Sequence, residues 1–170
     1  MSPSPTRRHR SRLPRLPFSG GEAGCLLDTR IERLITTREE GLRQWAAVDI
    51  ELAHHGLSAL HHWIIENTLP AKVRRLTGQR IHLHDRLRDD HDAIAELCGL
   101  TVACALPRFR RRALAGTGWQ PGRGTSAPTY FVGRCLMIFP GEYRRWKSEE
   151  DAADQPRPLP PYATCGYGTP

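Results

Sequence analysis

Apolar residues recur at helical spacing along most of the chain, and no stretch alternates for long enough to predict a strand. From Arg38 to His55 they return every three or four positions, which predicts an amphipathic helix. Residues 58–66 show the same period. Gly56 lies between the two runs, so the pattern predicts either two helices or one continuous helix.

The next predicted helix carries signals at both ends. Thr68 can serve as its N-cap, Pro70 falls in its first turn and Gly78 follows its last turn. The polar residues from Gln79 to Asp89 then predict a loop.

The clearest helical pattern runs from Asp89 to Gly116. Acidic residues precede its apolar face, as the positive end of the helix dipole favours, and four arginines crowd its opposite end. Pro107 removes one backbone hydrogen bond and therefore predicts a kink.

A turn-rich loop at 116–128 leads into a run from Tyr130 to Phe139 that is apolar nearly all round. Such a run predicts a central core helix. Pro140 and Gly141 predict a break that re-aims the chain before residues 143–147. The residues expected in the core include Leu97, Val102, Phe131 and Leu136.

The length of 170 residues is enough for one domain with one core. Residues 1–27 and 148–170 are rich in proline and polar residues and are expected to be disordered tails. The remaining 28–147 are predicted to form an all-α domain, a small helical bundle. The sequence predicts neither a signal peptide nor a membrane span, so the expected location is the cytoplasm.

The net charge of +7 is concentrated near the N-terminus. The first 20 residues hold five arginines and no acid, which leaves only +2 for the rest of the chain. Such an arm either touches nucleic acid without sequence preference or is a solvated tail. A transit peptide is a third interpretation.

The sequence gives little support for a metal site or for a catalytic nucleophile. The five cysteines are an odd number, and Cys98, Cys104 and Cys135 fall inside apolar helical patterns that suit buried thiols. The eight histidines come without a paired-cysteine or zinc-protease motif. We therefore expect no metal, no cofactor and no catalytic residue.

The cluster Tyr143-Arg144-Arg145-Trp146-Lys147 is the strongest chemical signal. Its cations can meet phosphates and its rings can stack on exposed bases. The alternative interpretation is a helix end whose rings pack inward while its arginines face water.

Three segments in order resemble a known family. They are DDHDAIAELCGLTVACALPRF at 89–109, GWQPGRGTSAPTYFVGRCL at 118–136 and EYRRW at 142–146. Together they resemble the second conserved region of bacterial RNA polymerase sigma factors of the extracytoplasmic-function type. In that family an acidic helix of the form A-x-D/E-L-x-Q-E-x-F-x-x-A-L docks on the polymerase, and a later helix with a basic end melts and reads the promoter.

The resemblance covers roughly residues 57–147. The residues that fit the docking helix are Glu96, Leu97, Thr101, Val102, Ala105 and Leu106. Those that fit the loop and the start of the next helix are Trp119, Pro121, Gly124, Thr125, Thr129, Tyr130 and Phe131. The family's Gln-Glu pair is replaced by Gly99 and Leu100, and the expected Arg-Asn falls near Leu136 and Met137. The residues beyond Trp146 are too few for the family's helix-turn-helix domain.

The resemblance implies a sigma-like regulator of transcription initiation that is not an enzyme. Its implied partners are partly melted promoter DNA and, as a second partner, core RNA polymerase. The implied DNA-binding residues are Tyr130, Arg134, Tyr143, Arg144, Arg145, Trp146 and Lys147. The implied polymerase-binding residues are Asp92, Glu96, Leu97 and Thr101. The alternative function is a helical protein-interaction module that has lost DNA binding, and a metal-dependent enzyme ranks third.

Overall fold

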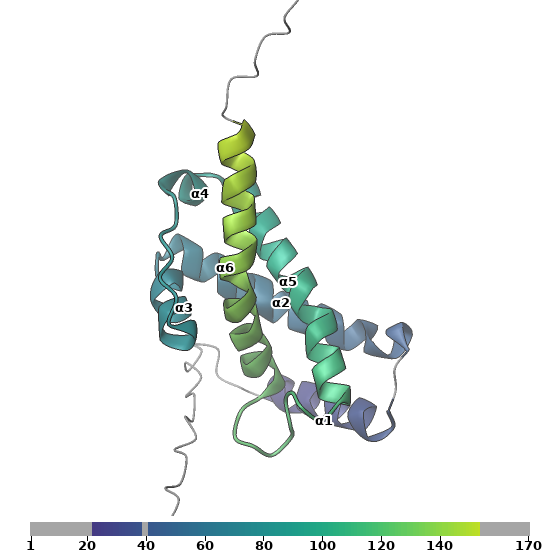
Figure 1. The fold of residues 1–170 in the computed structure, drawn as a ribbon. Coiled ribbons are helices and arrows are strands. Elements are labelled where there is room, and N and C mark those ends of the chain that lie inside the picture. The colour runs from purple at the N-terminus through teal and green to yellow at the C-terminus, as the bar shows by residue number, and fades with distance from the viewer. Residues whose placement is uncertain (1–21, 39–40, 154–170) are drawn as a thin grey trace, which may run out of the picture.

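The computed structural model describes residues 22–38 and 41–153, and this part of the chain forms helices and no strand (Figure 1). The all-α prediction is therefore confirmed. The helices are α1 (Glu22–Thr36), α2 (Leu42–Ile65), α3 (Leu69–Thr77), α4 (Asp85–Asp89), α5 (His91–Leu114) and α6 (Ala127–Ala153). Among these helices, none combines the length and the apolar content that crossing a membrane requires.

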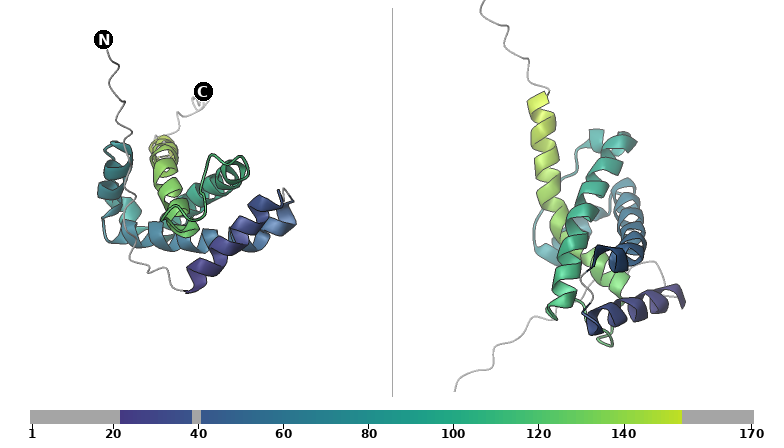
Figure 2. Two further views of the ribbon diagram at one scale, coloured as in Figure 1. Left: turned by 90° about the horizontal axis from the view of Figure 1, so that it is seen from below. Right: turned by 90° about the vertical axis from the view of Figure 1, so that its right-hand side faces the viewer.

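Three helices form the centre of the bundle. α5 and α6 pack against each other, and both cross α2 (Figure 1). α1 lies against α2 and α6 at the end of the bundle where α6 begins, whereas α3 packs on α6 from the other side (Figure 2). The four residues expected in the core, Leu97, Val102, Phe131 and Leu136, are all buried.

The two predicted runs around Gly56 form one continuous helix, α2. Gly56 does not end it, because the residue is buried where α2 meets α5 and α6. A side chain there would collide with Val102 and Phe131, so the glycine serves close packing rather than helix termination.

α6 also continues where the sequence predicted a break. It runs through Pro140 and Gly141 to Ala153, so the chain is not re-aimed before residue 143. Pro140 and its neighbour Phe139 are buried, as is Tyr143 in the next turn. Burial of this face outweighs the single backbone hydrogen bond that proline removes.

The expected tail boundaries are wrong by a few residues at each end. α1 begins at Glu22, inside the tail predicted over 1–27, and α6 extends to Ala153, inside the tail predicted over 148–170. The rest of both predicted tails lies outside the described residues.

The helix ends partly follow the predicted signals. Asp90 caps α5, because its Oδ1 accepts hydrogen bonds from the backbone N–H groups of Asp92 (3.0 Å) and Ala93 (2.9 Å). Thr68 stands at the N-cap of α3 without a side-chain capping bond, and Gly78 ends that helix at a φ of 76°. The predicted loop at 79–89 contains the short helix α4, which His84 caps through Nδ1.

Candidate nucleic-acid interface

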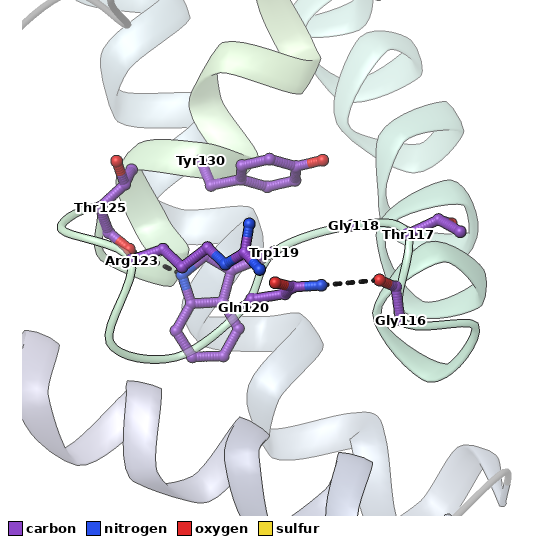
Figure 3. Close-up of a pocket in the computed structure, with 8 residues that line it drawn as sticks. All are labelled: Gly116, Thr117, Gly118, Trp119, Gln120, Arg123, Thr125 and Tyr130. Carbon is purple, nitrogen blue, oxygen red and sulfur yellow. Dashed lines mark hydrogen bonds between the residues drawn. The ribbon is translucent and has the colours of Figure 1, made fainter. Parts of the chain in front are cut away.

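The loop between α5 and α6 encloses a recess of about 300 Å³ beside the first turns of α6 (Figure 3). We call it the loop recess. It is lined by Gly116, Thr117, Gly118, Trp119, Gln120, Arg123, Thr125 and Tyr130. These lining residues include a guanidinium and no acid.

The loop folds tightly onto the end of α5. Gly116 adopts a φ of 68°, which glycine tolerates, and the backbone N–H groups of Thr117 and Gly118 both donate to the carbonyl of Arg112. A Cβ at Gly118 would stand 2.9 Å from the Cβ of Arg112, so this glycine allows the close approach. The exposed Arg112 side chain consequently starts next to the recess.

Trp119 forms the floor of the recess. Its side chain is only 3 % exposed, and its indole N–H donates to the carbonyl of Thr125 at 2.7 Å. The bond ties the two ends of the loop together. The sequence predicted only a turn-rich loop here, and the structure anchors that loop through the one large ring that it contains.

The half-buried Tyr130 forms the opposite wall. Its ring packs on Phe109 with 6.1 Å between centroids. Gln120 donates from Nε2 to the carbonyl of Gly116 at 2.8 Å, and the exposed Arg123 reaches from the loop toward the recess (Figure 3). The partly exposed ring of Tyr130 and the exposed guanidinium of Arg123 suit a planar ligand that carries negative charge nearby, with the buried Trp119 beneath them.

A cationic stripe leads away from the loop recess along α6. At 3.6 residues per turn, Arg134, Met137, Gly141, Arg144, Arg145 and Ser148 all project within about 60° of the direction of Tyr130. Arg134 is half-buried and donates to the sulfur of Met137, and the residues beyond it are exposed. We call these residues the α6 stripe. It extends about 22 Å from Tyr130 to Arg145.

Tyr143 is not part of this surface, which corrects the prediction. Its side chain is 4 % exposed, and its ring stacks between Phe139 and Trp146. Its hydroxyl donates to the carbonyl of His82 (2.8 Å) and accepts from the backbone N–H of His84 (2.9 Å). Tyr143 therefore fastens the segment before α4 to α6.

Trp146 projects on the side of α6 opposite the stripe. It is half-buried and shares a surface pocket with Arg86 and His91 and with four acids, Asp89, Asp90, Asp92 and Glu150. These acids repel a DNA backbone, so the structure separates Trp146 from the cations that the sequence placed beside it. Lys147 is exposed but projects about 100° away from the direction of Tyr130 around the helix, which places it outside the α6 stripe.

Two of the four predicted polymerase-binding residues are exposed and two are buried. Asp92 and Glu96 are exposed on α5. Leu97 and Thr101 are fully buried, and the Thr101 hydroxyl donates to the carbonyl of Leu97 at 2.8 Å. Their side chains belong to the core and are not available to a partner on the folded surface.

A mainly apolar groove of about 630 Å³ lies between α2 and α5, next to Glu96. It is lined by Leu57, Ser58, His61, Ala95, Cys98 and Gly99. Leu57 and Leu100 are large apolar side chains that remain exposed in this area. The groove coincides with the position where Gly99 and Leu100 replace the polar pair of the resembled family.

Over residues 22–38 and 41–153, no three histidine, cysteine or acidic side chains come together in a group that could hold a metal ion. No protein-family model, curated protein or solved structure matches this chain.

Proposed function

We propose that this protein is a sigma-like regulator of transcription initiation that binds partly melted promoter DNA and has no catalytic activity of its own. The observation that carries the proposal is the continuity between the loop recess and the α6 stripe. An unpaired base would enter the recess, and the phosphates of the same strand would follow the stripe.

The chemistry of the loop recess and of the α6 stripe suits this ligand. Any of the four bases can stack on an aromatic side chain, and arginines bind phosphates. Arg134, Arg144 and Arg145 belong to the α6 stripe, and Arg123 lines the recess. Arg145 is exposed and lies 3.5 Å from the carboxylate of Glu142, whose side chain is only 11 % exposed, so a phosphate would compete with this contact for the guanidinium.

The direct test is binding of the full-length chain to forked and fully paired DNA, measured by fluorescence anisotropy over a range of salt concentrations. Replacing Arg144 and Arg145 by alanine should lower the salt slope by about two if each meets one phosphate. Tyr130→Ala should weaken the binding of forked DNA by about 1–3 kcal/mol and leave the binding of paired DNA nearly unchanged.

Trp146→Ala is the matched control, because Trp146 lies opposite the α6 stripe. The five arginines near the N-terminus are present in every variant, so their unspecific contribution cancels. If forked and paired DNA bind equally and the Tyr130 and arginine variants change neither, the DNA-binding function is wrong.

A protein-interaction module is the second candidate function, and the apolar groove between α2 and α5 favours it. The exposed Glu96 follows the lining residue Ala95 on α5, so the groove suits an apolar helix with a basic residue at its edge. Core RNA polymerase is the partner that we propose for this surface.

Glu96→Lys should abolish co-purification of core polymerase without changing the thermal midpoint. Glu149→Lys, on the exposed end of α6, carries the same charge change away from the groove and should not. If the wild-type chain never retains polymerase, the polymerase-binding part of the proposal fails.

A further inference from the structure

Asp28 of α1 makes a hydrogen bond to the start of α6, although it belongs neither to the loop recess nor to the α6 stripe. Its Oδ1 accepts a hydrogen bond from the backbone N–H of Ala127 at 2.7 Å, across 99 residues of sequence. Ala127 is the first residue of α6 and is buried. Burial raises the pKa of Asp28, and the hydrogen bond from Ala127 opposes that rise.

The start of α6 has only a weak local cap. The Ser126 hydroxyl pairs with the hydroxyl of Thr129 at 2.9 Å and lies 3.4 Å from the Thr129 backbone nitrogen. The carbonyl of Ser126 accepts the first helical bond, from the N–H of Tyr130. The shorter carboxylate contact at Ala127 therefore supplies the stronger cap, and a negative charge is favoured at this end of a helix.

Both aromatic walls of the loop recess depend on this short segment. The residue before Ser126 is Thr125, whose carbonyl holds the Trp119 indole. Tyr130 follows Ala127 by less than one turn and carries the other wall. A shift at Ala127 would move the two rings relative to each other.

α1 is itself firmly seated. Leu27, Ile31 and Leu34 are buried, and Arg30 forms an ion pair with Glu51 of α2. Asp28 thus projects from a helix that is fixed on two sides, and it can hold the α6 start in place.

We propose that Asp28 is a positioning residue of the loop recess. Its hydrogen-bond partner Ala127 does not line the recess, but this bond fixes the α6 start and through it the position of Tyr130 relative to Trp119. The inference rests on the proposed function in that the ligand held in the loop recess, against Tyr130, is an unpaired base.

The test compares two forked DNA probes with the same phosphates, one with unpaired bases and one with abasic sites in the unpaired arm. Asp28→Ala in the full-length chain should lower the affinity for the probe with bases by about fivefold or more, since stacking of one base is worth about 1–3 kcal/mol. The substitution should leave the affinity for the abasic probe and the salt dependence of binding unchanged. Asp28→Asn keeps an acceptor oxygen and should restore binding of the probe with bases.

Arg30→Gln is the matched control on the same helix, because it removes a contact of α1 with α2 but leaves the Asp28 bond intact. Equal weakening of both probes by Asp28→Ala, or failure of Asp28→Asn to restore binding, would overturn the proposal. The proposal would also be overturned if the Asp28→Ala variant bound the probe with bases as tightly as the wild-type chain.

Hydrogen exchange separates this proposal from the proposed function. Asp28→Ala should accelerate exchange of the amides from Trp119 to Tyr130 and leave those in the middle of α2 unchanged, while Arg30→Gln should not accelerate the loop. Unchanged loop exchange overturns the positioning role. If the exchange pattern holds but the wild-type chain binds both probes equally, the DNA-binding function fails and the positioning role stands.

Discussion

Gly56 of α2 lies directly against Phe131 of α6: a Cβ on Gly56 would stand 2.9 Å from Cε1 of that ring. The same Cβ would stand 2.9 Å from a methyl group of Val102 on α5. The three central helices meet at this point, so their separation depends on the absence of a side chain.

Gly56→Ala should destabilise the fold. Overpacking costs about 1–3 kcal/mol, which exceeds the roughly 1 kcal/mol that alanine gains in helix propensity. Gly99→Ala is the control, since a Cβ on that helical glycine meets no atom within 4 Å and should stabilise the fold by up to about 1 kcal/mol. Urea unfolding monitored by circular dichroism measures both changes, and a higher midpoint for Gly56→Ala would contradict the packing described here.

Tyr143→Phe should lower stability without changing DNA binding. The substitution leaves the carbonyl of His82 and the N–H of His84 without their partner, at a cost of about 1–3 kcal/mol. Tyr130→Phe removes the same atom from a half-buried ring and should change the free energy of unfolding little. Weaker DNA binding by Tyr143→Phe at unchanged stability would return Tyr143 to the interface.

The cysteines should differ sharply in reactivity. Burial raises the pKa of the Cys98 thiol to about 12 and raises the pKa of Cys135 as well, whereas Cys25 is exposed. At pH 8 a thiol reagent should therefore modify Cys25 in the native protein and reach Cys98 and Cys135 only in denaturant. Peptide mapping by mass spectrometry locates the label, and native labelling of Cys98 at the rate of Cys25 would show that the core opens there.

Stability should fall as the pH drops below about 6.5. Burial lowers the pKa of His55, and His54 lowers it further against the opposing effect of Glu51. The unfolded chain therefore binds a proton at a higher pH than the folded chain, so stability is lost as the pH falls from the unfolded toward the folded pKa. Thermal midpoints between pH 7.5 and 5 should flatten in His55→Gln but not in His62→Gln, and equal slopes in both would exclude His55 as the cause.

Local signals in the sequence determined most helices and some of their ends. The acids before α5 and the glycine after α3 act within one turn of the backbone groups that they satisfy, so their effect is readable without a fold. The apolar period likewise identified Leu97 and Phe131 as core residues. The same local reasoning failed at Gly56 and Pro140, because burial against other helices outweighed their intrinsic effect on a helix.

The direction in which each side chain of α6 points was decided only by the tertiary structure. The helical period fixes the angles between Tyr143, Arg144 and Trp146, but packing against the segment before α4 and the start of α5 fixes which of them face inward. The bond between Asp28 and Ala127 has no local signal at all, since it joins residues 99 positions apart. The sequence by itself therefore determined an all-α chain with a basic, aromatic end. The packing of the helices decided that Tyr130 lies at the loop recess, that Tyr143 is buried and that Trp146 faces a pocket lined by acids.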